Sequence, residues 1–239
     1  NQVTVNITIA EDAPTGPRDI SVTTPAGSFT LVKGFTVKQA LPTITSISPG
    51  EGNRETELNI TINGGHFSGA SDLHFGAGIG VEDFAILSPN QITARISISS
   101  SAPTGPRDVS VTTPGGTVTL AGGFTVKPAL PVITSITPAS GSQGATLDVT
   151  IVGKNLTGTS ELRFGTGIAV NSFNVLSPDR VIARITIVAS AEKGSRDISV
   201  TTPGGSFTLP GGFIITQAPP RITSISPSLG SQGDIIDII

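Results

Sequence analysis

Residues 41–47 read Leu-Pro-Thr-Ile-Thr-Ser-Ile, and residues 130–136, which lie 89 positions further on (130 − 41), read Leu-Pro-Val-Ile-Thr-Ser-Ile. The same opening returns at 220–225 as Pro-Arg-Ile-Thr-Ser-Ile. Residues 41–129 align with 130–218 without a gap, and 46 of the 89 aligned positions are identical. Self-similarity at a fixed period is the sequence signature of a tandem repeat.

The repeat divides the chain of 239 residues into four parts. Residues 1–40 correspond to the C-terminal part of one unit, because Asn1 aligns with Asn90 in the middle of the next. Residues 41–129 and 130–218 are two complete units, and residues 219–239 begin another. The simplest interpretation is a segment of a longer tandem array.

Within one unit, apolar and polar residues alternate at period two in several short runs, as at 58–62, 92–98 and 109–111. This alternation is typical of half-buried strands, and groups rich in Gly, Pro and Ser punctuate the runs. About seven short strands in each unit, with no helical period, predict an all-β chain of tandem immunoglobulin-like β-sandwiches. The chain contains no Cys, so these sandwiches have no disulfides.

One hairpin turn can be interpreted more closely by comparing its copies. Residues 113–116 and 202–205 read Thr-Pro-Gly-Gly, whereas residues 24–27 read Thr-Pro-Ala-Gly. A type II turn requires a positive φ at the third residue, where Ala26 would be unfavourable, but a type I turn accepts Ala there and favours the Gly that follows. We therefore predict a type I turn in the first copy and, by analogy, in all three.

The repeated motifs resemble those of a known family. The pattern Pro-x-Ile-Thr-Ser-Ile-x-Pro at 42–49, 131–138 and 220–227 resembles the start of IPT/TIG immunoglobulin-like domains, and the Gly-rich hairpins at 113–124 and 202–213 are similar to their end. The resemblance covers the whole chain and implies early-set sandwiches of the kind common in large prokaryotic surface and secreted proteins. The family also occurs in Rel-type transcription factors, plexin-type receptors and some starch-active enzymes, so the fold does not fix the function.

The junctions between units are short and contain proline, as at 126–131 and 215–220. Pro-containing linkers of this length are semi-rigid. We expect the units to be arranged as an extended rod.

Composition excludes several classes of partner and site. The net charge of −3 and the 14 Lys and Arg residues argue against binding of nucleic acid. No apolar run of 18 or more residues is present, so this segment is not expected to insert into a membrane. Without Cys, a cysteine nucleophile, a Cys-ligated zinc and an iron–sulfur cluster are also excluded.

The sequence indicates no catalytic or ligand-binding site that the repeats share. The two histidines, His66 and His74, become Asn155 and Arg163 in the next unit, and alternation places His74 on the solvent side of its strand. Residues 76–80 superficially suggest a nucleotide-binding loop, but a hairpin turn is the better interpretation. We predict no catalytic, cofactor-binding or metal-binding residues, no cofactor, and no enzymatic activity in this segment.

An Arg-Asp pair recurs once in every unit, as Arg18-Asp19, Arg107-Asp108 and Arg196-Asp197. One interpretation is structural, as a cap or an ion pair in each unit, with the arginine stem covering the end of the core. The sharper hypothesis is a contact between domains or with a partner.

Three Asn-x-Thr sequences match the acceptor pattern for N-glycosylation, at Asn6, Asn59 and Asn155. Alternation predicts that Asn59 faces outward. Only a glycosylating secretory route would use these residues.

The leading hypothesis for function is a structural repeat segment of an extracellular or cell-surface protein: a spacer, a stalk, a sheath component or a filament unit. Its partners would be neighbouring repeats of the same chain and other copies of itself in a filament or surface layer. The alternatives are an adhesion or carbohydrate-binding module, and accessory domains of a secreted enzyme whose catalytic domain lies outside this segment. A subsidiary hypothesis, based on the apolar run at 234–239, is partial strand pairing between the incomplete units of two chains.

Overall fold

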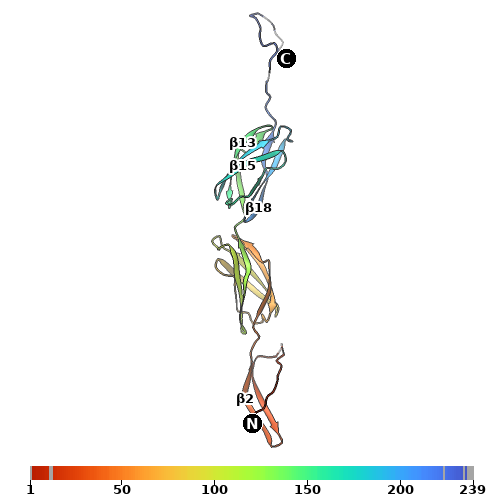
Figure 1. The fold of residues 1–239 in the computed structure, drawn as a ribbon, viewed down its shortest axis with the longest axis vertical. Helices are drawn as coiled ribbons and strands as arrows, with labels where there is room; N and C mark the ends of the chain where they lie inside the picture. Colours follow the sequence, from red (N-terminus) through yellow and green to blue (C-terminus); the bar gives the residue numbers. More distant parts are fainter. Residues whose placement is uncertain (1, 11–12, 223, 234, 236–239) are drawn as a thin grey trace. The chain divides into compact units, whose positions relative to one another are not determined.

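A computed structural model describes residues 2–10, 13–222, 224–233 and 235. The described residues form strands, turns and irregular segments, and the chain separates into two compact units, Asn1–Ala129 and Leu130–Ile239 (Figure 1). The boundary falls between Ala129 and Leu130, where one repeat meets the next.

The described residues of the first unit form ten strands: β1 (Gly16–Thr24), β2 (Gly27–Val37), β3 (Thr43–Ser48), β4 (Glu51–Asn53), β5 (Thr56–Gly65), β6 (Asp72–His74), β7 (Ile79–Ser88), β8 (Gln91–Ile98), β9 (Gly105–Thr113) and β10 (Gly116–Lys127). The described part of the second unit contains β11 (Val132–Thr137), β12 (Ser140–Ser142), β13 (Thr146–Lys154), β14 (Glu161–Arg163), β15 (Ile168–Ser177), β16 (Arg180–Ile187), β17 (Gly194–Thr202) and β18 (Gly205–Thr216).

Strands β3 to β10 form two four-stranded sheets, in the orders β3-β5-β8-β7 and β4-β10-β9-β6. The next repeat forms two sheets of the same topology, β11-β13-β16-β15 and β12-β18-β17-β14. Each complete repeat is therefore an immunoglobulin-like β-sandwich, as the alternating pattern predicts. Each complete repeat has eight strands, close to the expected number of about seven, and the short strands β4 and β12 pair in parallel with β10 and β18.

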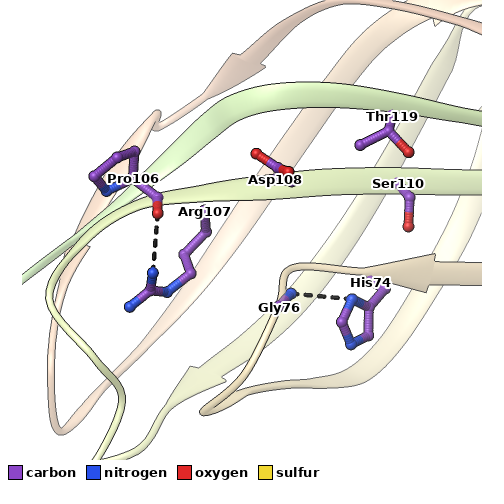
Figure 2. Close-up of a pocket in the computed structure, with 7 residues that line it drawn as sticks. All are labelled: His74, Gly76, Pro106, Arg107, Asp108, Ser110 and Thr119. Carbon is purple, nitrogen blue, oxygen red and sulfur yellow. Dashed lines mark hydrogen bonds between the residues drawn. The ribbon is translucent and has the colours of Figure 1, made fainter.

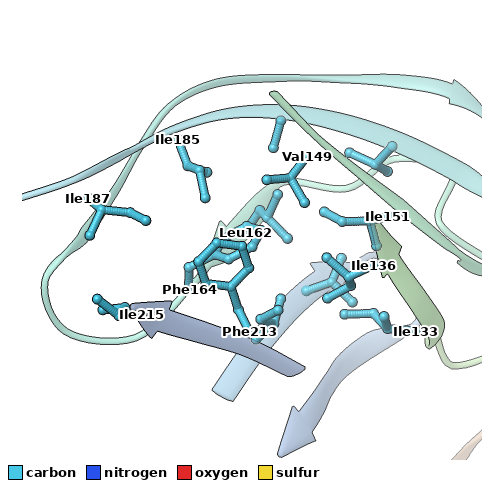
Figure 3. Packing of buried hydrophobic residues seen from close by; sticks show 14 of the residues in the cluster. Ile133, Ile136, Val149, Ile151, Leu162, Phe164, Ile185, Ile187, Phe213 and Ile215 are labelled. Carbon is cyan, nitrogen blue, oxygen red and sulfur yellow. The ribbon is translucent and has the colours of Figure 1, made fainter. Parts of the chain in front are cut away.

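The core of each sandwich consists of the alternating apolar side chains that face between the sheets. In residues 41–129 the fully buried side chains include Ile62, Phe75, Ile96, Val109 and Phe124. Figure 3 shows the matching cluster in the second unit, with Phe164 and Phe213 among isoleucines and valines. In each core two phenylalanine rings pack edge to face at 5.6 Å between ring centroids, Phe75 with Phe124 and Phe164 with Phe213.

Strands β1 and β2 repeat the β9–β10 hairpin, with the same register and a bulge at the same place. Their apolar residues lie at core positions of the repeat: Ile20 corresponds to Val109 and Ile198, which are 0% exposed.

The hairpin turns agree with the type I prediction. Ala26 and its counterparts Gly115 and Gly204 do not have a positive φ, whereas the following residues Gly27, Gly116 and Gly205 have φ values of 138°, 134° and 135°. The positive φ therefore falls on the glycine that all copies share, and Ala is accepted one residue earlier.

The prediction of a hairpin turn at 76–80 is wrong. β6 pairs with β9 in one sheet and β7 pairs with β8 in the other, so this segment crosses between the two sheets. At Gly78 a Cβ atom would lie 2.5 Å from the Cα of Ala102, and the φ of Gly78 is 81°. Glycine is required here by a close backbone approach and a left-handed conformation, rather than by a hairpin.

The apolar run at 234–239 lies outside the described residues, except for Ile235. Pairing between the incomplete units of two chains therefore stays a prediction.

We expect Phe124→Ala to destabilise the sandwich of residues 41–129 by about 3–5 kcal/mol, because it removes a fully buried ring and leaves a cavity beside Phe75. Urea denaturation should then resolve two transitions, with the sandwich of residues 130–218 unfolding at the higher concentration. Leu87→Ala is the control, because Leu87 is 60% exposed and surface substitutions usually change stability by less than about 0.5 kcal/mol. Equal effects of the two substitutions would contradict this description of the core.

Candidate functional site

The aspartate of each Arg-Asp pair accepts a hydrogen bond from the backbone of the neighbouring strand. The Oδ1 atoms of Asp19, Asp108 and Asp197 accept from the amides of Lys33, Gly122 and Gly211 at 2.7, 2.8 and 2.8 Å. These three amides belong to left-handed residues, with φ values of 54°, 62° and 62°, at the bulge in β2, β10 and β18. A bulge interrupts the ladder of backbone hydrogen bonds, and the carboxylate supplies the missing acceptor.

The arginine of each pair donates to carbonyl groups around its own loop. In the second unit, Arg196 donates from Nε to the Thr166 carbonyl at 2.9 Å and from Nη1 to the Ser195 carbonyl at 2.8 Å. Its Nη2 donates to the Glu192 carbonyl at 2.5 Å. The guanidinium therefore ties the loop that precedes β17 to the crossover between β14 and β15.

The copies in the first unit preserve two of these three contacts. Arg107 donates to the carbonyls of Pro106, at 2.9 Å, and Pro103, and Arg18 donates to those of Pro17 and Pro14. The Nε atom of Arg107 is buried without a hydrogen-bond partner.

The recurring pair is thus built into the fold of each unit. The structural interpretation as a cap agrees with these hydrogen bonds, whereas the ion pairs found in the described part of the chain do not join any of the three arginines to its aspartate. A contact of Arg18, Asp19, Arg107, Asp108, Arg196 or Asp197 with another domain or partner stays a prediction.

A shallow pocket of about 370 Å³ lies beside this pair in residues 41–129 (Figure 2). Its lining consists of His74, Gly76, Pro106, Arg107, Asp108, Ser110 and Thr119. His74 is exposed, as alternation predicts, and its Nδ1 accepts a hydrogen bond from the Gly76 amide at 3.1 Å. Within the described residues no hydrogen bond joins His74 to Ser110 or to Asp108, so the three side chains do not form the relay of a serine nucleophile.

The pocket offers hydrogen-bonding groups rather than an assembled reaction centre. Hydroxyls, a guanidinium, an imidazole and a carboxylate line it, with no aromatic platform. In the second unit the position of His74 is taken by Arg163, which pairs with Glu161 at 2.6 Å. The imidazole is therefore a feature of a single unit.

The other histidine is explained by the backbone. His66 and its counterpart Asn155 have φ values of 59° and 56°. Among residues other than glycine, Asn, Asp and His are enriched in this left-handed region. The exchange of His66 for Asn155 therefore follows a conformational requirement that both side chains meet.

The three glycosylation candidates differ in accessibility. Asn59 is exposed on β5, as alternation predicts, and Asn6 is exposed in the irregular segment before β1. Asn155 is half-buried, and its Nδ2 donates to the Leu130 carbonyl at 2.9 Å. Glycosylation at any of them stays a prediction.

The surface ion pairs of the two units are not copies of one another. In the first unit Arg95 pairs with Glu57 and Lys127 with Glu51, and in the second unit Arg184 pairs with Asp148 at 3.1 Å. The hydrogen bond and the charge of Glu57 raise the pKa of Arg95, and Asp83 and Glu82 act in the same direction. Such exposed pairs contribute little to stability, and their variation between copies is typical of a solvated surface.

The described residues contain no group of three or more His, Cys, Asp or Glu side chains that could hold a metal ion. The same part of the chain has no helix that is long and apolar enough to cross a membrane.

Comparison with protein families gives one match. The family model described as quinohemoprotein amine dehydrogenase, alpha subunit domain III, matches residues 41–121 and again residues 130–209. Both matches lie within the complete repeats. A comparison with curated protein sequences gives no match.

Several solved structures are similar at low sequence identity. Titin domains I67–I69 are 12% identical, cover 84% of this chain and 75% of theirs, with a TM-score of 0.43. The plexin A4 extracellular region is 19% identical, with coverage of 75% and 18% and a TM-score of 0.36. SGBP-B from a xyloglucan utilization locus of Bacteroides uniformis is 20% identical, with coverage of 71% and 48% and a TM-score of 0.27. The chain thus spans less than half of the length of the plexin and SGBP-B chains.

We expect Arg196→Lys to lower the stability of the second unit by about 1–2 kcal/mol, because an ammonium group cannot reproduce the fork that reaches three carbonyls. Thermal denaturation followed by circular dichroism measures the loss. Arg163→Lys is the matched control, since the side chain of Arg163 is 69% exposed and forms a single surface ion pair. If both variants melted at the temperature of the parent chain, Arg196 would not be a structural cap.

Proposed function

Because the chain belongs to the family described as quinohemoprotein amine dehydrogenase, alpha subunit domain III, we propose that its complete repeats are non-catalytic β-sandwich modules that act as a spacer in a larger extracellular or cell-surface protein. The family description refers to one domain of a subunit, and two consecutive copies of that domain occur here. The IPT/TIG character of the modules is part of the same proposal, supported by the motifs at 42–49 and 131–138.

One observation carries the proposal: the Arg-Asp pair that recurs in every unit is used to build that unit. Asp108 and Asp197 satisfy the amide at a bulge, and Arg107 and Arg196 hold loop carbonyls. The exposed histidine beside this pair is not shared, because His74 is replaced by Arg163 in the second unit. A spacer requires a stable fold in every repeat, but it does not require the same exposed side chains in every repeat.

The residues at the start of each complete repeat pack against the Gly-Gly hairpin of the same repeat. A Cβ atom on Gly116 would lie 2.7 Å from Cδ2 of Leu41, and a Cβ atom on Gly205 would lie 2.7 Å from Cδ2 of Leu130. At Gly115 a Cβ atom would lie only 2.1 Å from the carbonyl oxygen of Ala40. The Gly-Gly hairpin thus gives room for the incoming chain to pack closely, which supports restricted linkers.

A spacer should hold its modules apart in solution. We expect small-angle X-ray scattering of the chain to show an elongated particle whose largest dimension does not change with salt. Pro128→Gly combined with Ala129→Gly should broaden the distribution of interatomic distances, because Gly-rich linkers are flexible. Neither residue is buried in a sandwich, so both sandwiches should stay folded in this variant. A compact particle for the parent chain would contradict the spacer proposal.

The alternative, an adhesion or carbohydrate-binding module, is supported by the pocket in Figure 2, whose hydroxyls and charged groups could bind sugar hydroxyls. The sequence has no Tyr or Trp, and Phe75 and Phe124 are fully buried. Stacking platforms for sugar rings are therefore lacking from this pocket.

The spacer proposal predicts no binding on a glycan array. A signal that Ser110→Ala abolishes, and that Ser199→Ala in the second unit leaves unchanged, would instead establish the pocket of the first unit as a carbohydrate site. The two serines occupy equivalent positions, so the second variant controls for any general effect of losing a hydroxyl.

A further inference from the structure

Within each complete repeat, the chain enters beside one end of the last strand and leaves from the other end of that strand. Leu41 lies beside the start of β10, because a Cβ atom on Gly116 would be 2.7 Å from Cδ2 of Leu41, and β10 ends at Lys127. In the second unit Leu130 lies in the same way beside Gly205 at the start of β18. Further repeat sequence precedes and follows each complete repeat, so tension along the chain acts along the last strand.

A short parallel strand binds the end of this last strand. β4 pairs in parallel with the last residues of β10, and β12 pairs in the same register with β18. The amide of Thr125 donates to the Gly50 carbonyl at 2.9 Å. The amide of Arg54 donates to the Lys127 carbonyl at 3.0 Å, and the second unit has the same two bonds at the same lengths. In its sheet β4 is an edge strand, so β10 alone holds it there.

The direction of the load decides how these hydrogen bonds are stretched. β4 follows the entry of the chain and β10 precedes its exit, so pulling the two ends apart drives the paired strands in opposite directions along their common axis. Hydrogen bonds between strands run across the strands, and all of them are therefore stretched together. A hairpin that is opened from one end loses its bonds one after another, which requires less force.

A glycine lets the short strand lie directly on the core. Gly52 of β4 is buried, and a Cβ atom there would be 2.3 Å from Cδ1 of Leu58 and 3.1 Å from Cζ of Phe124. Gly141 has the same place in β12, where a Cβ atom would be 3.2 Å from Cζ of Phe213. A displacement of β4 along β10 therefore also disrupts the packing of β4 on the core.

We propose that the complete repeats are tension-resisting modules, in which the parallel pairs β4–β10 and β12–β18 keep the sandwich closed against force along the chain. Tension has to detach residues 41–53, which β5 holds at β3 and β10 holds at β4. This goes beyond the proposed spacer function, because a spacer can separate its ends without resisting tension.

The first complete repeat has additional side-chain contacts across the pair. Lys127 of β10 donates to Glu51 of β4 at 2.5 Å, and Nδ2 of Asn53 donates to the Pro128 carbonyl at 2.6 Å. In the second repeat the positions of Glu51, Asn53 and Lys127 carry hydroxyl side chains, Ser140, Ser142 and Thr216. An exposed ion pair contributes little to equilibrium stability, but here it joins the two strands that tension would separate.

The test is single-molecule force spectroscopy of the 239-residue chain, held by its two ends at constant force. The parent chain should show two unfolding steps of roughly 250–300 Å, the extended length of 89 residues less that of the folded repeat. Thr125→Pro removes the amide that binds Gly50 and should raise the unfolding rate of one step about tenfold. Ile214→Pro is the equivalent change in the second repeat and should act on the other step.

A triple variant tests the same pair without introducing a proline. Glu51→Ser, Asn53→Ser and Lys127→Thr give the first repeat the residues that the second repeat already has, so the sandwich should stay folded. We expect this variant to unfold severalfold faster under force, in the step that Thr125→Pro also affects, because the contacts across β4 and β10 are lost.

Leu73→Ala is the control for overall stability. Leu73 is 5% exposed and lies in β6, at the opposite edge of the sheet from β4. This variant should lower the melting temperature but leave the unfolding rate under force within about twofold, because its contacts are intact when residues 41–53 detach.

The proposal is overturned if Leu73→Ala accelerates forced unfolding as much as Thr125→Pro does, because force would then report only overall stability. It is also overturned if neither Thr125→Pro nor the triple variant changes the unfolding rate. The spacer function would survive both results, since scattering from the unloaded chain tests it separately.

Discussion

Burial of alternating apolar side chains between two four-stranded sheets is the interaction on which each complete repeat depends. There is no disulfide to replace it, because the chain has no Cys. The β1–β2 hairpin has the register and bulge of β9–β10, and its apolar positions correspond to positions that are buried in the two complete repeats, such as Val109 and Ile198. The stability of a unit therefore comes from the complete sandwich, in which Val109 and Val111 are fully buried.

A second constraint acts on the backbone. Amide and carbonyl groups that do not pair with a neighbouring strand need other hydrogen-bond partners. The bulge in β10 and the loops at the end of β9 create such groups, and Asp108 and Arg107 provide partners for them. These contacts explain why the Arg-Asp pair recurs in every unit. Two kinds of surface position can thus be distinguished. Positions that complete the fold, such as Arg107 and Asp108, are identical between copies, whereas the edge strands β7 and β15 differ in charge.

Much of this fold was predictable from sequence, because period-two alternation and an 89-residue repeat are strong signals. The type I turn, and the exposure of Asn59 and His74, also followed from local patterns. Alternation alone does not reveal strands β4 and β12, because a run of three residues that contains Gly is too short to show it, and their parallel partners are set by the tertiary fold. The prediction of a hairpin at 76–80 is wrong because Gly78 is needed for a close contact with the backbone of Ala102. Ala102 is distant in sequence, so local patterns do not reveal this contact. The aspartates accept hydrogen bonds from the amides of left-handed residues at a bulge. Gly122 and Gly211 are typical of that conformation, but the equivalent residue in the first copy is Lys33, so the sequence pattern does not indicate a left-handed position.

Each complete repeat folds around its own core and carries its own structural polar contacts. Hydrogen exchange of the backbone amides in increasing sub-denaturing urea reports which segments open together, and it therefore distinguishes independent repeats from a single cooperative unit. We expect two cooperative blocks that change at the boundary between Ala129 and Leu130, with the amides of Gly122 and Gly211 exchanging together with the blocks that contain them. A single block spanning both repeats, or fast exchange of these two amides while β9 and β17 stay protected, would contradict it.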